Sequence, residues 1–135
     1  MPFDKKYLFK KNNIVVIKHG GGKHLRVNPQ AEHQADAHGG KGKFAQWHIE
    51  LHDFGKKCKL KNKHSGKYLR IQGGDTVNVG GVGGPLTLFK VHTWGQVNEV
   101  KLESNKFVGK YVAVRNGNVV IGGGGPFTKL EIFRD

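Results

Sequence analysis

Three stretches of the chain share one pattern: GGGKHLRV at Gly20–Val27, KHSGKYLRI at Lys63–Ile71, and KFVGKYVAV at Lys106–Val114. Their Gly-Lys pairs begin at Gly22, Gly66 and Gly109, so the pattern recurs after 44 and then after 43 residues. A fixed period of this length indicates an internal structural repeat. The sequence therefore predicts one domain over residues 1–135, with repeats at about 8–53, 54–95 and 96–135.

The same order of features surrounds each of these stretches. An alternating apolar segment precedes the stretch, and a glycine-rich loop follows it. A second alternating segment then closes the repeat: FAQWHIEL from Phe44, LTLFKVH from Leu86, and TKLEIF from Thr128. Alternation with a period of two predicts short, half-buried strands, and the glycine runs and Asn-Gly-Asn at Asn116–Asn118 predict turns. Four short strands in each repeat give twelve.

Three all-β units of about forty residues have few ways to bury their apolar faces. A propeller normally needs at least four blades, and a solenoid needs distinct capping repeats. A closed barrel with three hairpins over one end leaves no open sheet edge. The sequence therefore predicts an all-β fold, a β-trefoil of twelve short strands. Its predicted core consists of Val16, Leu25, Trp47, Ile49, Leu60, Leu69, Phe89, Val91, Leu102, Val112, Leu130 and Ile132.

The composition restricts the environment and the partners. Cys58 is the one cysteine, so no intrachain disulfide can form. The N-terminus has no signal-peptide pattern and no segment approaches the roughly 20 apolar residues of a spanning helix, so we expect a cytoplasmic protein or one exported without a classical signal. The formal net charge of +13 favours polyanions as partners or serves solubility.

Two families resemble these repeats. Asn62–Ile71 and Phe44–Glu50 resemble ricin-B-type lectins, whose repeats open with Ser-Gly-Lys-Tyr-Leu and close around Gln-Trp. Gln-Trp occurs only at Gln46-Trp47, and Arg26, Arg70 and Ala113 stand near the place of the usual sugar-binding aspartate. Val100–Val120 is similar to the fascin and hisactophilin group of actin-binding trefoils, to which the eight histidines add a weaker likeness.

A third resemblance is to mussel-type galactose-binding trefoils, which carry His-x-Asp-x-His before each closing strand. Here His33, Asp36 and His38 lie in the matching loop of repeat one, with the spacing changed by one residue. Asp accepts hydrogen bonds from sugar hydroxyls, and a neutral His donates or accepts. We therefore expect a carbohydrate site at His33, Asp36, His38, Gly39 and Gly40. The other candidate positions are Asp75, Asn116 and Asn118.

The sequence favours binding over catalysis. Its two serines, Ser65 and Ser104, lie in no nucleophile motif, and no carboxylate pair is marked by its setting. We expect no enzyme activity, no cofactor and no metal site. The leading hypothesis is a lectin-like module that binds a carbohydrate or glycoconjugate through repeat one. The resemblance to mussel-type trefoils suggests sugars of the galactose type. The alternative is an actin- or acidic-lipid-binding protein that uses its basic, His-rich surface, and nucleic acid ranks lowest.

Overall fold

The computed structural model describes residues 14–20, 22–73, 76–93 and 98–134. The first repeat supplies β1 (Ile14–Lys18), β2 (His24–Asn28), β3 (Ala31–Gly39) and β4 (Trp47–His52). The second supplies β5 (Lys57–Asn62), β6 (Tyr68–Gln72), β7 (Thr76–Gly81) and β8 (Phe89–Thr93). The third supplies β9 (Glu99–Ser104), β10 (Tyr111–Arg115), β11 (Asn118–Gly122) and β12 (Leu130–Arg134). The predicted twelve strands are confirmed.

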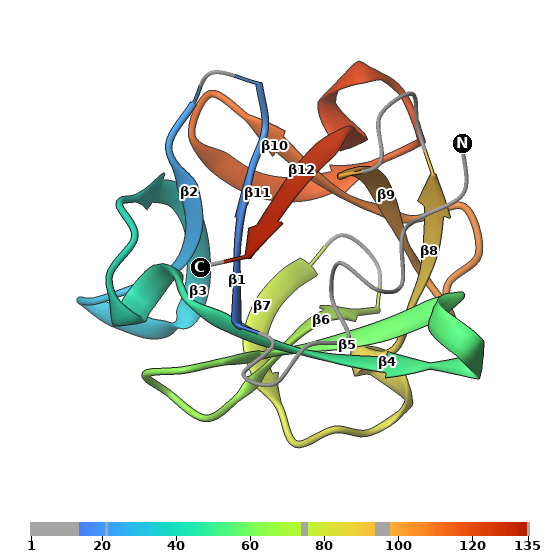
Figure 1. The fold of residues 1–135 in the computed structure, drawn as a ribbon, viewed down its shortest axis with the longest axis horizontal. Coiled ribbons are helices and arrows are strands. Elements are labelled where there is room, and N and C mark those ends of the chain that lie inside the picture. Colours follow the sequence, from blue (N-terminus) through green and yellow to red (C-terminus); the bar gives the residue numbers. More distant parts are fainter. Residues whose placement is uncertain (1–13, 21, 74–75, 94–97, 135) are drawn as a thin grey trace.

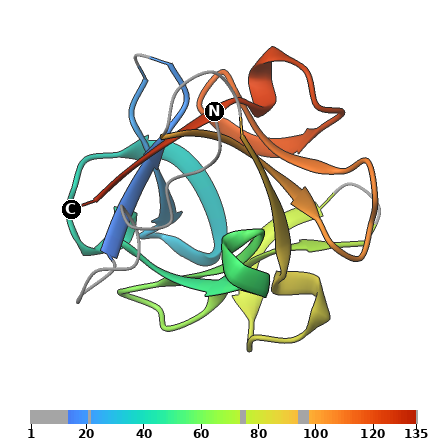
Figure 2. The ribbon, with the colours of Figure 1, turned by 45° about the vertical axis from the view of Figure 1, so that its right-hand side comes forward.

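A short 3-10 helix precedes the closing strand of every repeat. These helices are η1 (Lys43–Ala45), η3 (Pro85–Thr87) and η4 (Pro126–Thr128), and η2 (Asp53–Gly55) joins the first repeat to the second. The three repeats occupy three sectors around a common centre, coloured blue to teal, green to yellow and orange to red (Figure 1). Figure 2 shows the same arrangement from a second direction.

The strand pairing closes a barrel. β1 pairs with β4, β4 with β5, β5 with β8, β8 with β9, β9 with β12, and β12 with β1. The remaining strands form the antiparallel hairpins β2–β3, β6–β7 and β10–β11, which contact one another. Six strands in a closed ring with three hairpins give the predicted β-trefoil with pseudo-threefold symmetry.

The apolar face of each strand fills the interior of the barrel. Trp47, Phe89 and Leu130 begin β4, β8 and β12, and all three side chains are fully buried. The Trp47 indole donates to the Leu25 carbonyl at 3.1 Å, which satisfies its polar atom inside the core. Ten of the twelve predicted core residues belong to the buried cluster, and Val91 packs against that cluster while only half-buried.

Val16 is the exception, and its prediction as a barrel-core residue was wrong. Val15 and Ile17 belong to the core cluster, whereas Val16 is buried outside it. The strand pairing makes Ile17, not Val16, equivalent to Leu60, since each lies opposite a core isoleucine of a neighbouring strand. Ile17 lies five residues before Gly22, whereas Leu60 lies six residues before Gly66. A one-residue shift of this kind turns a strand's side chains to the other face.

Other sequence expectations have structural counterparts. Cys58 is fully buried in the core, and burial raises the pKa of its thiol to about 12, so it remains a protonated, unreactive thiol. No described helix has the length and apolar character needed to cross a membrane.

Candidate functional site

The predicted sugar-binding loop of repeat one is a strand. His33, Asp36 and His38 lie on β3, which pairs with β2 in an extended, bulged conformation. His33 lines hollows beside β7, with Asn78 and Gly80 among its neighbours. His38 lines a different hollow beside the β10–β11 hairpin. The expectation of a loop was wrong because the bulged pairing extends β3 through this polar segment, and it separates the two histidines.

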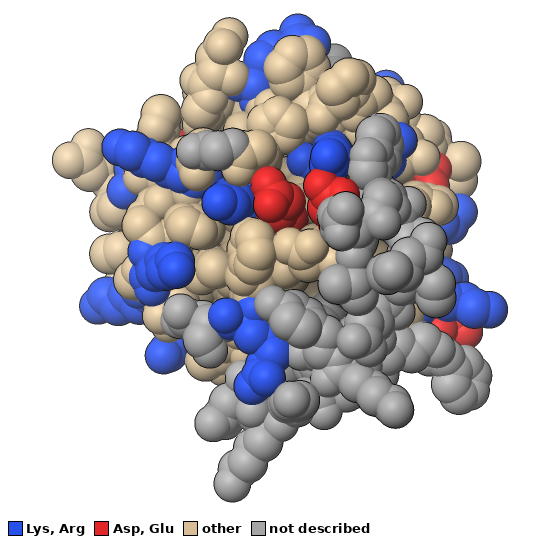
Figure 3. Space-filling model, turned by 45° about the horizontal axis from the view of Figure 1, so that its top comes forward, with Lys and Arg blue, Asp and Glu red and all other residues tan. Residues whose placement is uncertain are grey.

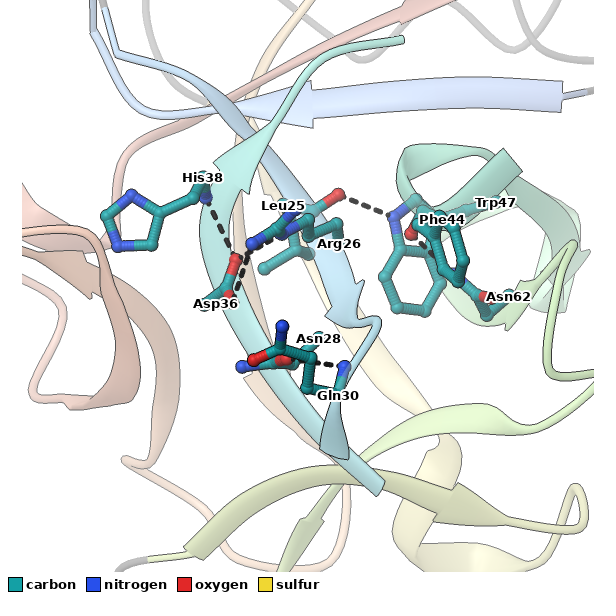
Figure 4. Close-up of polar contacts among 9 residues, drawn as sticks. All are labelled: Leu25, Arg26, Asn28, Gln30, Asp36, His38, Phe44, Trp47 and Asn62. Carbon is teal, nitrogen blue, oxygen red and sulfur yellow. Dashed lines mark hydrogen bonds and ion pairs between the residues drawn. The ribbon is translucent and has the colours of Figure 1, made fainter. Parts of the chain in front are cut away.

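Asp36 is already engaged by a neighbouring side chain. Arg26 Nε donates to Asp36 Oδ1 at 2.8 Å, and a second guanidinium nitrogen lies 3.4 Å from Oδ2. The backbone N–H of His38 donates to the same Oδ1 at 3.0 Å, while the His38 imidazole points away from the carboxylate (Figure 4). With its side chain only 13% exposed, Asp36 is held as a structural ion pair.

The two glycines predicted beside this motif have different surroundings. Gly39 is buried, and a Cβ added to it would lie 2.8 Å from the His24 carbonyl oxygen and 3.0 Å from the Ala45 Cβ. Close packing therefore accounts for Gly39. Gly40 is exposed with open space around it. Asp75 lies outside the described residues.

Candidate residues of repeats one and three meet at the junction of β3 with the β10–β11 hairpin. Asn116 and Gly117 form the hairpin turn with φ of 53° and 79°, the conformation that Asn-Gly favours. The Ala37 N–H donates to the Gly117 carbonyl at 2.9 Å, and Asn118 lies opposite Asp36. The His38 ring covers Gly117, where an added Cβ would lie 2.4 Å from its Cε1.

The same cross-strand position differs among the three hairpins. Arg26 faces Asp36 in repeat one, and Arg70 faces Asn78 in repeat two, where Arg70 Nε donates to Asn78 Oδ1 at 2.8 Å. In repeat three the facing residues are Ala113 and Val120. A small apolar pair thus replaces a long, hydrogen-bonded polar pair.

This replacement leaves a hollow, here called the repeat-three groove, beside the β10–β11 hairpin and η4. Its volume is about 510 Å³, and its defining residues are Ala113, Arg115, Val120, Ile121, Gly122 and Phe127. The Phe127 side chain is 44% exposed, unusual for a large aromatic ring. The Arg115 guanidinium lies 4.6 Å from the centre of that ring, within the range of a cation–π contact.

A second hollow, here called the adjoining hollow, shares Phe127 with the groove. Its volume is about 290 Å³, and His19, Lys23, His38 and Asn116 line it. His19 Nδ1 lies 2.8 Å from the Lys129 carbonyl oxygen; because that oxygen only accepts, Nδ1 carries the proton. No carboxylate of the described residues lines either hollow.

Sequence reasoning named some of the residues that line the two hollows. His38 and Asn116 were singled out and do lie together, whereas Phe127, Arg115 and Lys23 were missed. Alignment of the repeats contained the usable signal, because Ala113 stands where the other repeats have Arg26 and Arg70.

Within the described residues, no group of three His, Cys, Asp or Glu side chains has the geometry to hold a metal ion.

Comparison with known proteins supports the fold. No protein-family model matches the sequence, and no curated protein matches it. Among solved structures, the chain is similar to a designed 3-fold symmetric protein, ThreeFoil, with a TM-score of 0.72 and 24% sequence identity. The match covers 90% of this chain and 99% of that one. At this identity the likeness shows a trefoil-type fold with threefold symmetry and nothing of the ligand.

Proposed function

We propose that the protein is a non-enzymatic, lectin-like carbohydrate-binding module whose site is the repeat-three groove. The observation that carries the proposal is the small apolar pair Ala113 and Val120 of repeat three. At the same position, repeats one and two have a large polar pair that contains an arginine, so only repeat three has open space there. A ligand site is expected to be concave and mostly apolar, with a few polar groups that fix orientation.

The groove has the groups that a sugar ring requires. The exposed Phe127 ring presents a flat apolar surface to the C–H face of a pyranose. Arg115 donates only, whereas the Asn116 amide both donates and accepts, so together they suit hydroxyl groups of either role. Gly123 lets a ligand approach the backbone closely, because it has no side chain and open space surrounds the place of a Cβ.

The proposal moves the site away from the His33, Asp36 and His38 motif. Asp36 is paired with Arg26, and His33 lies on another hollow, so those three side chains do not converge on one ligand. His38 remains part of the proposed site through the adjoining hollow. The ligand class stays that of the lectin hypothesis, with a different set of residues.

The absence of catalysis is part of the same proposal. Both serines serve turns: the Lys67 N–H donates to Ser65 Oγ at 3.2 Å, and the Phe107 N–H donates to Ser104 Oγ at 2.9 Å. Ser104 is also fully buried, where a substrate does not reach it. These contacts support structural roles for the two hydroxyl groups most suited to nucleophilic chemistry.

The second candidate function is the binding of actin or an acidic lipid surface. The exposed lysines Lys23, Lys67 and Lys110 follow the Gly of the repeated Gly-Lys pair in all three repeats. In the face shown in Figure 3, Lys and Arg side chains are spread widely rather than gathered in one patch. A dispersed positive surface attracts polyanions without a shaped pocket.

A double variant that fills the groove tests the proposed site. Ala113→Arg with Val120→Asp introduces the Arg–Asp pair of repeat one and leaves the net charge unchanged. We expect a glycan array and titration of the best sugar to show a loss of binding of at least about tenfold, because the side chains occupy the ligand's space. Acidic-vesicle and actin co-sedimentation should stay unchanged, since those depend on total charge.

A matched pair of variants separates the groove from the fold. Phe127→Ala removes the aromatic surface of the groove, while Phe44→Ala removes the phenylalanine at the same place in η1 of repeat one. We expect sugar binding to be lost only in Phe127→Ala, with thermal unfolding confirming that both variants fold. Full sugar binding by both Phe127→Ala and the groove-filling variant would overturn the proposal.

A further inference from the structure

Resting on the proposed carbohydrate site, we infer that the ligand is an acidic sugar, whose carboxylate or sulfate group is bound between Arg115 and the basic side chains of the adjoining hollow.

Among the residues that the structure describes, every ionisable side chain lining the two hollows is basic. They are Arg115 in the repeat-three groove and His19, Lys23 and His38 in the adjoining hollow, and Phe127 connects the two. They come from the β1–β2 turn, from β3 and from β10, so three separate segments place basic groups around one aromatic ring. A cleft lined by a single sign of charge concentrates ligands of the opposite sign.

The carboxylates of neighbouring elements are already paired. Asp36, two residues from His38, forms its ion pair with Arg26 at 2.8 Å. Glu99 lies 2.8 Å from Lys129 Nζ, the residue whose carbonyl binds His19. These two carboxylates are therefore paired with cations outside the hollows, and no described carboxylate lines the hollows beside Arg115 and Lys23.

Arg115 is placed to bind an acidic substituent of a sugar that lies on the Phe127 ring. Its guanidinium lies 4.6 Å from the centre of the Phe127 ring, so a pyranose lying on the exposed part of that ring brings its substituents near the guanidinium. The planar donors of arginine match the paired oxygens of a carboxylate or sulfate. A neutral sugar would cover part of this cation and offer only hydroxyl dipoles in return, so it should bind more weakly.

Three sugars that share one ring test the inference: galactose, galacturonic acid and galactose 6-sulfate, titrated by NMR or calorimetry. We expect one or both acidic sugars to bind roughly tenfold or more tightly than galactose at low salt, as hydrogen bonds to charged groups are the stronger ones. Added salt should reduce the preference by screening. Arg115→Gln should bring the ratio toward one, whereas Arg115→Lys, which keeps the charge, should retain part of it.

The control variant is Lys56→Gln, which removes an exposed charge at the end of η2, outside both hollows, and should leave the ratio unchanged. Equal binding of galactose and both acidic sugars would overturn the inference and leave the proposed function intact. Acidic-sugar binding that survives Ala113→Arg with Val120→Asp would also overturn it, since the sugar would lie elsewhere. Failure of the wild-type protein to bind these sugars or any arrayed glycan would overturn the proposed function itself.

Discussion

Glu103 on β9 is a buried carboxylate held by two hydrogen bonds. His92 Nε2 lies 2.7 Å from Oε1, and the Gly109 N–H donates to Oε2 at 2.6 Å. Burial alone would raise the pKa of Glu103, but the bonds from Gly109 and His92 and the nearby charge of Lys90 outweigh it, and the pKa is lowered. Gly109 belongs to the third Gly-Lys pair, so the Glu103 carboxylate holds the turn between β9 and β10 in which this pair lies.

The substitution Glu103→Gln should destabilise the protein in a pH-dependent way. The lowered folded-state pKa means that the ionised carboxylate stabilises the fold above the unfolded-state pKa of about 4.3, and that this stabilisation is lost as pH falls through the folded-state value. At pH 7 we expect a loss of about 1.5–3 kcal/mol in the free energy of unfolding, the range for a hydrogen bond to a charged group. Urea unfolding at pH 7 and pH 3 measures it.

The exposed carboxylate Glu32 provides the control: its Oε1 lies 3.1 Å from His64 Nε2, and an exposed ion pair of this kind contributes less than about 1 kcal/mol, so Glu32→Gln should change the unfolding free energy by no more than that. An equal loss for Glu103→Gln at pH 3 and pH 7 would show that shape, and not charge, determines the role of Glu103.

At the scale of elements, each hairpin packs closely against the 3-10 helix that follows it. In every repeat the contact is made by the glycine at the end of the hairpin's second strand. Gly39, Gly81 and Gly122 end β3, β7 and β11 and lie close to Ala45, Thr87 and Thr128 respectively. A Cβ added to Gly81 would lie 2.3 Å from the Thr87 Cγ2, and one added to Gly122 would lie 2.5 Å from the Thr128 Cγ2. The repeated glycine loops thus have a packing role in all three repeats.

Gly81→Ala should therefore destabilise the protein by about 1–3 kcal/mol, the usual range for overpacking. Thr87→Ser removes the clashing methyl group but keeps the hydroxyl that donates to the Gly84 carbonyl at 2.6 Å. The double variant should recover much of the stability, and a double-mutant cycle of unfolding free energies measures that coupling. Additive losses in the cycle would contradict the proposed contact.

The strands were predictable from sequence because alternation with a period of two survives in every repeat. Two features of the elements were not predictable. The core residue Ile17 lies five residues before Gly22, whereas Leu60 lies six residues before Gly66, so the period of the repeat indicated Val16 rather than Ile17 as the core residue. Bulges between β2 and β3 extend the pairing through His33–Gly39, where the resemblance to mussel-type trefoils implied a loop.

At the scale of the whole molecule, three similar repeats close one barrel, and repeat three differs from the other two at the Ala113 and Val120 pair. The trefoil could be predicted because period, turn chemistry and edge closure agree. The candidate site could not be located from the sequence, because the sequence does not show that Asp36, a predicted sugar ligand, forms an ion pair with Arg26. Phe127 and His38 lie about ninety residues apart in sequence, and only the closure of the barrel brings them to the same hollow.

The most direct test of the central claim is a residue-by-residue map of sugar binding by ¹H–¹⁵N NMR. The account predicts that the best-binding sugar shifts backbone amides of Ala113–Thr128 and of the residues around His19 and His38, and that the equivalent amides of β6, β7 and η3 stay unchanged. Ala113→Arg with Val120→Asp should abolish those shifts. Shifts of similar size in all three repeats, or shifts confined to His33 and its neighbours on β7, would contradict the account.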